Sequence, residues 1–264
     1  MPATIHTHTA GHGRQLLLVH GLGGSCQSWS PVLPGLAARR EIIAIDLPGH
    51  GHSPASEDSG TFRGLADSLE DYILRNRLGG IDAAGVSLGG RLVLEMARRG
   101  CVGDVVALDP GGFWRGWERP YFKWTLGASF RLLRLLKGQL GRLSASPAAR
   151  SVLLAQLSAR PRSLPAELVE RELASFAGTP TVAPLIRDLA SGPAQQGPAA
   201  SAAGNITIGW GRKDRLCPPR QAKRARAAFP GAAFHWFEES GHYSIWDCPN
   251  QAARLILEAS GSGR

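Results

Sequence analysis

Short apolar segments alternate with segments of helical periodicity along most of the chain. Apolar, β-rich runs predict strands at residues 15–19, 41–46, 81–86, 105–108, 206–210 and 234–237. Between these runs apolar residues recur at helical spacing, as Phe62, Leu65, Leu69 and Ile73 do, and such residues share one helix face. Alternating strands and helices are typical of βαβ units, in which helices cover a parallel sheet. The pattern therefore predicts an α/β fold with a doubly wound, mostly parallel sheet.

Local signals indicate where the helices begin. Ser30 followed by Pro31 predicts a helix that runs to about Arg39, since serine caps a helix N-terminus and proline suits the first turn. Thr61 is predicted to cap the following helix in the same way. Further helices are expected at residues 88–99, 219–228 and 249–259.

The alternation stops after residue 112 and resumes near residue 204. The segment between predicts several short helices, because prolines interrupt it repeatedly, at Pro147, Pro161, Pro165, Pro180 and Pro184. A stretch rich in Gly, Pro and Ala at residues 191–204 is predicted to be a linker. We therefore expect a core formed by residues 1–112 and 204–264, with residues 113–203 inserted as a helical cap or lid.

Composition and length agree with this organisation. The chain has 264 residues, 43% of them hydrophobic, which suits one α/β core with an insertion and argues against disorder. No apolar run approaches the roughly 18 residues that span a bilayer, and the N-terminus lacks the pattern of a secretory signal. A soluble, cytoplasmic protein is expected, and its four cysteines are interpreted as free thiols.

The net charge of +9 is concentrated in the inserted segment, where twelve Lys and Arg stand against five Asp and Glu. A basic face can attract nucleic acid or anionic lipid. No nucleic-acid-binding motif accompanies the charge, so no nucleic-acid partner is expected. His6, His8 and His12 lie close together near the N-terminus. We interpret them as an incidental cluster in a flexible segment and expect no metal site.

One short motif carries candidate chemistry. Gly85-Val86-Ser87-Leu88-Gly89 matches the pattern G-x-S-x-G and lies between a predicted strand and a predicted helix, where a nucleophile elbow belongs. The turn is so sharp that side chains two residues on either side of the serine would collide, and glycine removes them. The pattern indicates that Ser87 is a nucleophile at the amino end of a helix, where anions are favoured.

Five separated motifs resemble those of the α/β-hydrolase family, in the order in which that family has them. They are His-Gly-Leu-Gly at 20–23, Asp-Leu-Pro-Gly-His-Gly-His-Ser at 46–53, the Ser87 elbow, Gly-Trp-Gly-Arg-Lys-Asp at 209–214 and Ser-Gly-His-Tyr at 240–243. The resemblance implies the α/β-hydrolase fold, and the insertion falls where the family has its lid. In this family the chain order is nucleophile, acid, histidine.

The resemblance implies a role for each matched residue. Ser87 is the expected nucleophile, His242 its general base and Asp214 the acid that orients the imidazole. Asp109, also at a strand end, is an alternative acid. The N–H groups of Leu22 and Leu88 are implied as oxyanion donors, with Gly23 as an alternative to Leu22. Two further expectations concern scaffolding: Asp46 shapes its turn, and His20, His50 and His52 support their loops.

The lid is expected to supply the substrate pocket. Leu126, Phe130, Leu133, Leu136 and Leu140 form an apolar stripe beside Arg131, Arg134 and Lys137. Trp114, Phe130 and Leu133 are candidate substrate-binding residues in an apolar pocket. The same stripe could instead lie on an anionic membrane surface. We expect at most weak lipid-surface contact and no stable membrane insertion.

The leading functional hypothesis is a serine hydrolase that cleaves a carboxylic ester, or a related acyl bond, of a small hydrophobic substrate. On the same fold and triad, a C–C bond hydrolase, a thioesterase, a lactonase or a cofactor-free haloperoxidase or perhydrolase are alternatives. A non-catalytic small-molecule binder is the rival from another class. No cofactor and no metal are expected, and the oligomeric state stays open.

Overall fold

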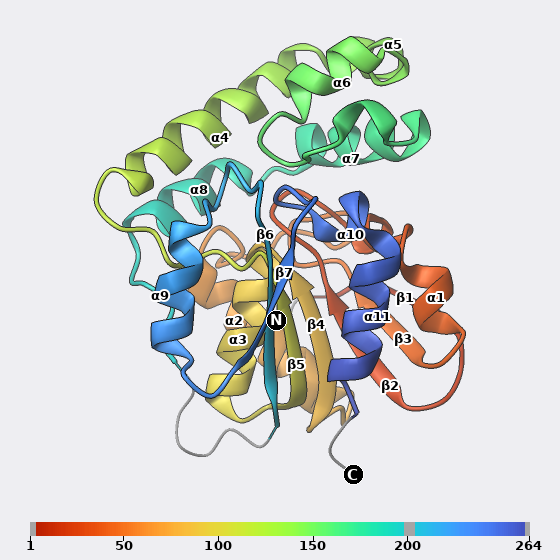
Figure 1. Cartoon of the computed structure of the whole chain (residues 1–264), viewed down its shortest axis with the longest axis vertical. Coiled ribbons are helices and arrows are strands. Elements are labelled where there is room, and N and C mark those ends of the chain that lie inside the picture. The colour runs from red at the N-terminus through yellow and green to blue at the C-terminus, as the bar shows by residue number, and fades with distance from the viewer. Residues whose placement is uncertain (1–3, 198–203, 262–264) are drawn as a thin grey trace.

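A seven-stranded sheet forms the centre of the molecule. The computed structural model describes residues 4–197 and 204–261, and the strand order is β1-β3-β2-β4-β5-β6-β7 (Figure 1). The strands are β1 (Thr7–Ala10), β2 (Gln15–Val19), β3 (Glu41–Ile45), β4 (Ile81–Val86), β5 (Val102–Leu108), β6 (Ile206–Gly211) and β7 (Ala233–Phe237). All neighbours pair in parallel except β1 and β3. The predicted doubly wound, mostly parallel sheet is confirmed.

Helices cover both faces of this sheet, as Figure 1 shows. Outside the lid they are α1 (Leu33–Ala37), α2 (Phe62–Arg75), α3 (Leu88–Arg99), α9 (Arg220–Ala228), α10 (Ser244–Asp247) and α11 (Pro249–Ala259), with the 3₁₀ helix η1 (Cys26–Trp29). Helices α1 and α11 pack together on one face, and α2 packs with α3 on the other. The central strands are buried on both sides, so their apolar residues lack the alternation of an exposed sheet.

Most element boundaries follow the local signals, and one does not. The hydroxyl oxygen of Thr61 accepts a hydrogen bond from Gly64 N at 3.0 Å and caps α2 as predicted. The predicted start of a helix at Ser30 is wrong. Ser25 forms a capping box that begins η1, and Ser30 ends that short helix by donating its N–H to Gln27 O. Consequently α1 begins only at Leu33, with Pro34 in its first turn.

The N-terminal segment is an edge strand and not a flexible tail, so that prediction was wrong. Strand β1 pairs antiparallel with β3 and places Thr7 opposite Ile45. The hydroxyl group of Thr7 also contacts that of Tyr72 at 3.1 Å. The sequence of β1 is polar and lacks alternation, because the strand is held by backbone pairing to an existing edge and not by a buried face.

The inserted segment forms a helical layer above the carboxyl ends of the strands (Figure 1). Its helices are α4 (Glu118–Leu135), η2 (Lys137–Gln139), α5 (Leu140–Ala145), α6 (Pro147–Leu153), η3 (Pro161–Ser163), α7 (Ala166–Gly178) and α8 (Val182–Ser191). The predicted end of the lid, at residue 203, lies outside the described residues, as do residues 198–203 of the predicted linker. In parallel sheets the carboxyl edge is where ligands bind, so the lid covers the expected location of a site.

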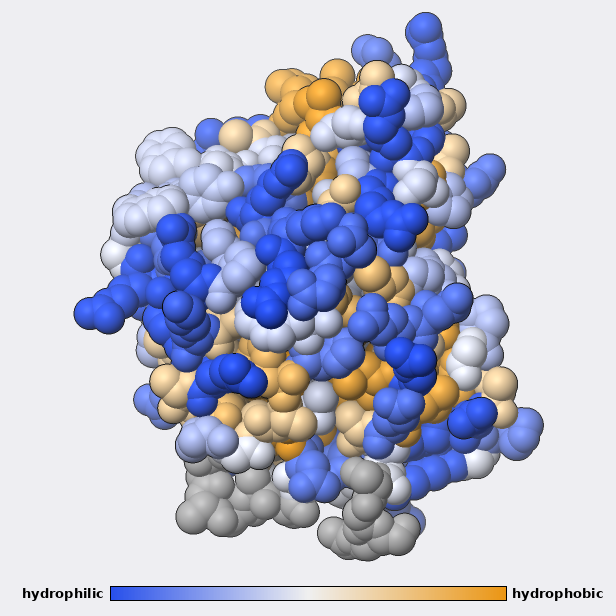
Figure 2. Space-filling view, in the orientation of Figure 1, coloured by the Kyte–Doolittle hydropathy of each residue, from blue (hydrophilic) through white to orange (hydrophobic). Residues whose placement is uncertain are grey.

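Large exposed apolar side chains gather on the lid. Five of the six that the described residues expose belong to it: Trp117, Trp124, Leu132, Leu135 and Val152. Figure 2 shows an apolar patch at the lid end of this face, with further apolar areas lower down among polar side chains. Across residues 4–197 and 204–261, the structure contains no helix with the length and apolar character needed to traverse a bilayer.

Candidate active site

Ser87 lies on a strained turn between β4 and α3. Its backbone angles are φ 56° and ψ −113°, a region that residues with a side chain rarely adopt. A Cβ atom at Gly85 would lie 2.2 Å from Gly89 O, and one at Gly89 would lie 2.0 Å from Val19 O. The two glycines are therefore required by backbone contacts. This turn lifts the Ser87 hydroxyl above the carboxyl edge of the sheet.

A chain of two hydrogen bonds joins Ser87, His242 and Asp214. His242 Nε2 lies 2.7 Å from Ser87 Oγ, and His242 Nδ1 lies 2.7 Å from Asp214 Oδ2. His242 and Asp214 are buried. Because the carboxylate accepts a hydrogen bond from Nδ1–H, the ring proton stays on Nδ1, and Nε2 is free to accept the serine proton. The three residues come from the ends of β4, β6 and β7 and meet only in the folded chain.

The Asp214 carboxylate is held from its other side as well. Its Oδ1 accepts hydrogen bonds from the N–H groups of Leu216 and Cys217, both at 2.8 Å. These bonds fix the carboxylate plane and leave Oδ2 directed at the imidazole. Such an arrangement restricts the ring to one tautomer and one orientation, which is the role of the acid in a triad.

Asp109, the alternative acid, occupies a different environment. It is fully buried, and its Oδ1 accepts a hydrogen bond from Gly211 N at 2.6 Å. Burial, followed by the nearby charge of Asp214, raises the pKa of Asp109 well above its usual value. No hydrogen bond links Asp109 to His242 within residues 4–197 and 204–261. Of the two candidates, the structure brings Asp214 to the imidazole.

The loop after β2 carries the candidate oxyanion donors. His20 Nε2 accepts a hydrogen bond from Leu47 N at 3.0 Å, so its Nδ1 donates to Gly21 O at 2.7 Å. Burial lowers the pKa of His20, which keeps the ring neutral as a support for this loop. The N–H groups of Leu22 and Leu88 donate to no acceptor in the described parts of the chain. Both remain available to a developing oxyanion.

Helix α7 of the lid is bonded to the same loop. Ser175 Oγ donates to Gly23 O at 2.8 Å, and Thr179 Oγ1 donates to it at 3.3 Å. One turn earlier, Glu172 Oε2 accepts a hydrogen bond from Ser28 Oγ at 2.7 Å. Burial raises the pKa of Glu172 to about 7. The sequence did not indicate this contact, because it joins residues more than 140 positions apart.

A cavity of about 240 Å³ opens above Ser87, between the core and the lid. Ser87, His242, Leu22 and Leu88 form part of its floor. The lid residues proposed from the sequence, Trp114, Phe130 and Leu133, are all in the lining, which is mostly apolar. Among the described lining residues, Arg91 is the one with a permanent charge, and its guanidinium group is engaged by Pro193 O at 2.8 Å and the ring of Phe62.

Tyr243 is a site residue that the sequence reasoning missed, although it directly follows His242. Its ring stacks on Trp246, with 3.9 Å between centroids. A Cβ atom at Gly21 would lie 2.5 Å from the Tyr243 hydroxyl and 3.3 Å from Ser87 Cβ, so the hydroxyl lies near Ser87. Burial, followed by the charge of Glu172, raises the pKa of Tyr243. The hydroxyl is therefore a neutral donor, and Tyr243 is among the residues that line the cavity.

The site offers no well-suited metal ligands in the described chain. Asp214, Cys217 and His242 have donor atoms within 4.8 Å of one another. However, Asp214 and His242 are committed to each other and to Ser87 by the hydrogen bonds above. Burial raises the pKa of the Cys217 thiol well above its usual value, and a protonated thiol is a poor ligand.

Comparison with known proteins places this fold and site in context. A protein-family model, described as the alpha/beta hydrolase family, matches residues 16–255 of this chain. A hydrolase of Cupriavidus pinatubonensis, named for 2-hydroxy-6-oxononadienedioate and 2-hydroxy-6-oxononatrienedioate, is 25% identical over 98% of this chain and 91% of its own. An uncharacterised protein of Mycobacterium tuberculosis is 28% identical over 94% of this chain and 74% of its own. The structure of a thermophilic esterase from Thermogutta terrifontis has a TM-score of 0.76 at 20% identity, covering 97% of this chain and 92% of that chain, a likeness of fold.

Proposed function

The chain belongs to the alpha/beta hydrolase family, and we propose that it is a serine hydrolase that cleaves carboxylic esters with a hydrophobic acyl group. The observation that carries this proposal is the hydrogen-bonded chain Ser87–His242–Asp214, with both imidazole contacts at 2.7 Å. Ser87, the proposed nucleophile, lines a largely apolar cavity of about 240 Å³. A cavity of this lining favours a hydrocarbon chain next to the scissile carbonyl.

The proposed reaction proceeds in two halves. Ser87 Oγ attacks the ester carbonyl carbon while His242 Nε2 takes the hydroxyl proton, and Asp214 stabilises the imidazolium that forms. The tetrahedral intermediate then collapses, and His242 returns the proton to the departing alcohol, which leaves an acyl group on Ser87. In the second half, water attacks this acyl group with His242 as base, and the carboxylic acid is released.

We assign three donors to the negative charge of the tetrahedral intermediate. The N–H groups of Leu22 and Leu88 are the first two, and Leu88 also has the positive end of the α3 dipole behind it. The Tyr243 hydroxyl is the third, because it lies beside Gly21 and Ser87 and remains protonated. Donors fixed before the reaction cost no reorganisation when charge develops.

Hydrolysis of a C–C bond next to a ketone is the second candidate. The similarity to the Cupriavidus hydrolase, at 25% identity over 98% of this chain, favours it. The same triad and donors serve this reaction on the family's fold. The lining argues for the ester instead, because it is mostly apolar and Arg91 is its one permanently charged residue in the described chain. A dicarboxylate substrate would need more polar partners than the cavity provides.

The test has two steps, of which the first asks whether the protein is an enzyme at all. A fluorophosphonate probe should label the wild-type protein and the exposed control Ser151→Ala, but not Ser87→Ala. Folded wild-type protein that stays unlabelled would favour a non-catalytic binder. In the second step, p-nitrophenyl esters of increasing acyl length are compared with a thioester, a lactone and a meta-cleavage dienoate. Turnover of the dienoate alone would overturn the ester proposal in favour of C–C hydrolysis.

A further inference from the structure

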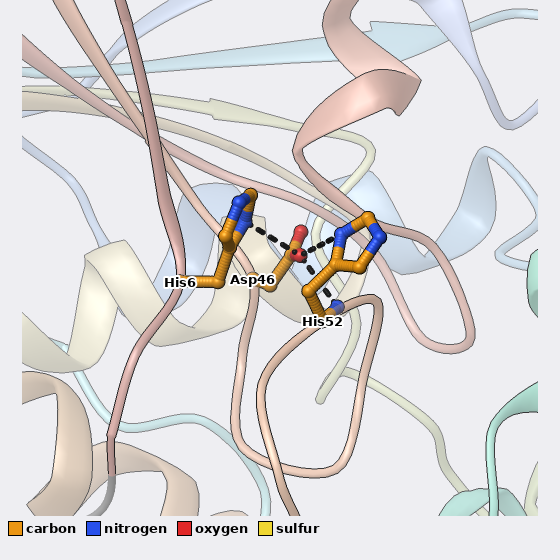
Figure 3. A group of neighbouring side chains, drawn as sticks. All are labelled: His6, Asp46 and His52. Carbon is orange, nitrogen blue, oxygen red and sulfur yellow. Dashed lines mark hydrogen bonds and ion pairs between the residues drawn. The ribbon is translucent and has the colours of Figure 1, made fainter.

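A second cluster of chemistry-bearing side chains lies at the N-terminal edge of the sheet. Asp46 directly follows β3, His6 directly precedes β1, and His52 lies in the turn after Asp46. Figure 3 shows the two imidazole rings on either side of the carboxylate. The Nδ1 atoms of His6 and His52 lie 3.1 Å and 3.6 Å from the same oxygen, Asp46 Oδ2. None of the three residues lines the active-site cavity.

Hydrogen bonds to backbone groups hold the three residues in place in addition to the contacts between their side chains. Asp46 Oδ1 accepts a hydrogen bond from Cys26 N at 2.6 Å, and Oδ2 accepts one from His52 N at 2.8 Å. The peptide group of His6 is tied on both sides: its N–H donates to Ser53 Oγ at 2.8 Å, and its carbonyl accepts from Asp46 N at 2.9 Å. The cluster is thus already assembled, which lowers the entropy lost when a ligand binds.

Only one of the two imidazole rings is within hydrogen-bonding distance of the Asp46 carboxylate. His6 Nδ1 can donate to Asp46 Oδ2 at 3.1 Å, whereas the 3.6 Å separation of His52 Nδ1 is too long for a hydrogen bond. The His52 side chain is 78% exposed and has no hydrogen-bond partner in the described chain. Two ring nitrogens therefore face one carboxylate oxygen, and only one of them is satisfied by it.

The nitrogen–oxygen distances in this cluster fit ligands that coordinate one metal ion. Donor atoms about 2.0 to 2.1 Å from a tetrahedral Zn²⁺ lie about 3.3 Å from one another. The observed 3.1 and 3.6 Å lie on either side of that value, and all three donor atoms are within 4.8 Å of one another. We propose that His6 Nδ1, Asp46 Oδ2 and His52 Nδ1 form a binding site for a divalent transition metal such as Zn²⁺, with water as the fourth ligand.

The donor set selects the class of metal. Imidazole nitrogens suit zinc, copper and nickel, whereas calcium and magnesium prefer sites made of oxygen atoms. The ion would join the edge strand β1 to the turn after β3, since His6 and His52 come from these two segments. Because it binds the folded arrangement, its effect is to stabilise the folded protein.

The experiment titrates the metal-free full chain with ZnCl₂ by calorimetry and records its melting temperature with and without zinc. Wild type should bind one equivalent and melt at a temperature about 4 °C higher or more when zinc saturates the site. His52→Ala is the decisive variant, because its exposed ring makes no hydrogen bond in the described chain. Zinc binding should weaken in this variant by more than the roughly 10- to 100-fold that loss of a supporting contact costs.

Two kinds of control separate this site from other zinc binding. His8→Ala and His12→Ala, in the same N-terminal segment, should bind zinc like wild type. Cys217→Ser should also still bind one equivalent of zinc, because Cys217 belongs to the group of potential ligands in the active site. Zinc binding that is unchanged in both His52→Ala and His6→Ala would overturn the proposal. It would also be overturned if Cys217→Ser were the one variant that lost the equivalent of bound zinc.

Discussion

The hydroxyl group of Tyr243 occupies the space that a side chain at residue 21 would need. A Cβ atom on Gly21 would lie 2.5 Å from this oxygen and 3.3 Å from Ser87 Cβ. The absence of a side chain at Gly21 is therefore what allows the loop, the nucleophile and the phenol to meet. This relationship leads directly to two predictions.

Gly21→Ala should lower kcat/KM by about 10²-fold, since a displacement of about 1 Å in a catalytic group can cost that much. Gly79→Ala is the matched control, because a Cβ atom there meets nothing within 4 Å. Steady-state kinetics on the best p-nitrophenyl ester measure both. Equal activity of the two variants would show that the Tyr243 contact has no catalytic consequence.

Tyr243→Phe should lower kcat by about 10²-fold while KM changes little, since one oxyanion donor is lost and the ring is kept. Binding of a boronic-acid transition-state analogue should weaken in parallel. Tyr72→Phe serves as the control, because it removes a tyrosine hydroxyl that contacts Thr7 and does not line the cavity. A rise in KM at constant kcat would instead assign the hydroxyl to ground-state substrate binding.

The two buried aspartates should differ sharply on amide substitution. Asp214→Asn should lower kcat by about 10⁴-fold, because the amide favours the wrong imidazole tautomer. Asp109→Asn should cost much less, since Asp109 makes no hydrogen bond to His242 in the described chain and the amide oxygen of asparagine can still accept from Gly211 N. Kinetics with melting curves for both variants check this pair. A larger loss in Asp109→Asn, with the fold intact, would transfer the role of the acid to Asp109.

Glu172 should make the folded protein less stable as the pH rises. Burial raises its pKa to about 7, against the opposing effects of Ser28 and Arg171. Between the usual carboxyl pKa and 7, the folded state holds a proton that the unfolded state has lost. The free energy of unfolding should therefore fall across this range, by up to about 3 kcal/mol.

Urea unfolding at a series of pH values tests this dependence. Glu172→Gln should show a flatter profile between pH 4.5 and 7, because its amide cannot ionise. Glu167→Gln, an exposed neighbour on the same helix, should keep the slope of the wild type. If the slope survives in Glu172→Gln, another group is responsible for it.

The exposed apolar side chains of the lid predict weak binding to anionic vesicles. Leu135 is 82% exposed and Trp124 is 68% exposed, and Arg131 lies on the same helix, α4. Co-sedimentation with vesicles should decrease for Arg131→Glu and for Leu135→Ser, whereas Arg63→Glu on the core helix α2 should match wild type. Arg134 is unsuited to this test, since it donates to Thr179 O at 2.8 Å. Equal sedimentation of all variants would contradict the prediction.

The parts of the fold that could be predicted from the sequence are those set by local patterns. The buried strands appear as apolar runs, and the elbow at Ser87 appears as two glycines that backbone contacts require. Strand β1 could not be predicted in this way, because its polar residues are ordered by backbone pairing with the edge strand β3 and not by a local pattern. The start of α1 was misjudged because Ser25, and not Ser30, begins the local helix.

The candidate site likewise contains residues that local motifs indicated and contacts that they did not. Motifs pointed to Ser87, Asp214 and His242, and the structure brings them together, while their roles rest on the proposed reaction. The Tyr243 hydroxyl and the contacts from Glu172 and Ser175 depend on the approach of segments that are distant in sequence. No local pattern encodes such an approach.

The bonds from α7 to the loop at Gly23 and Ser28 limit how this protein can change its substrate range. Rearranging α7 would also disturb the loop that carries Leu22, a proposed oxyanion donor. Helices α4 to α6 form no such bonds with that loop in the described chain. Variation in chain-length preference, in nature or in the laboratory, is thus expected to accumulate in residues 118–153, while 172–179 stay constant in any active descendant.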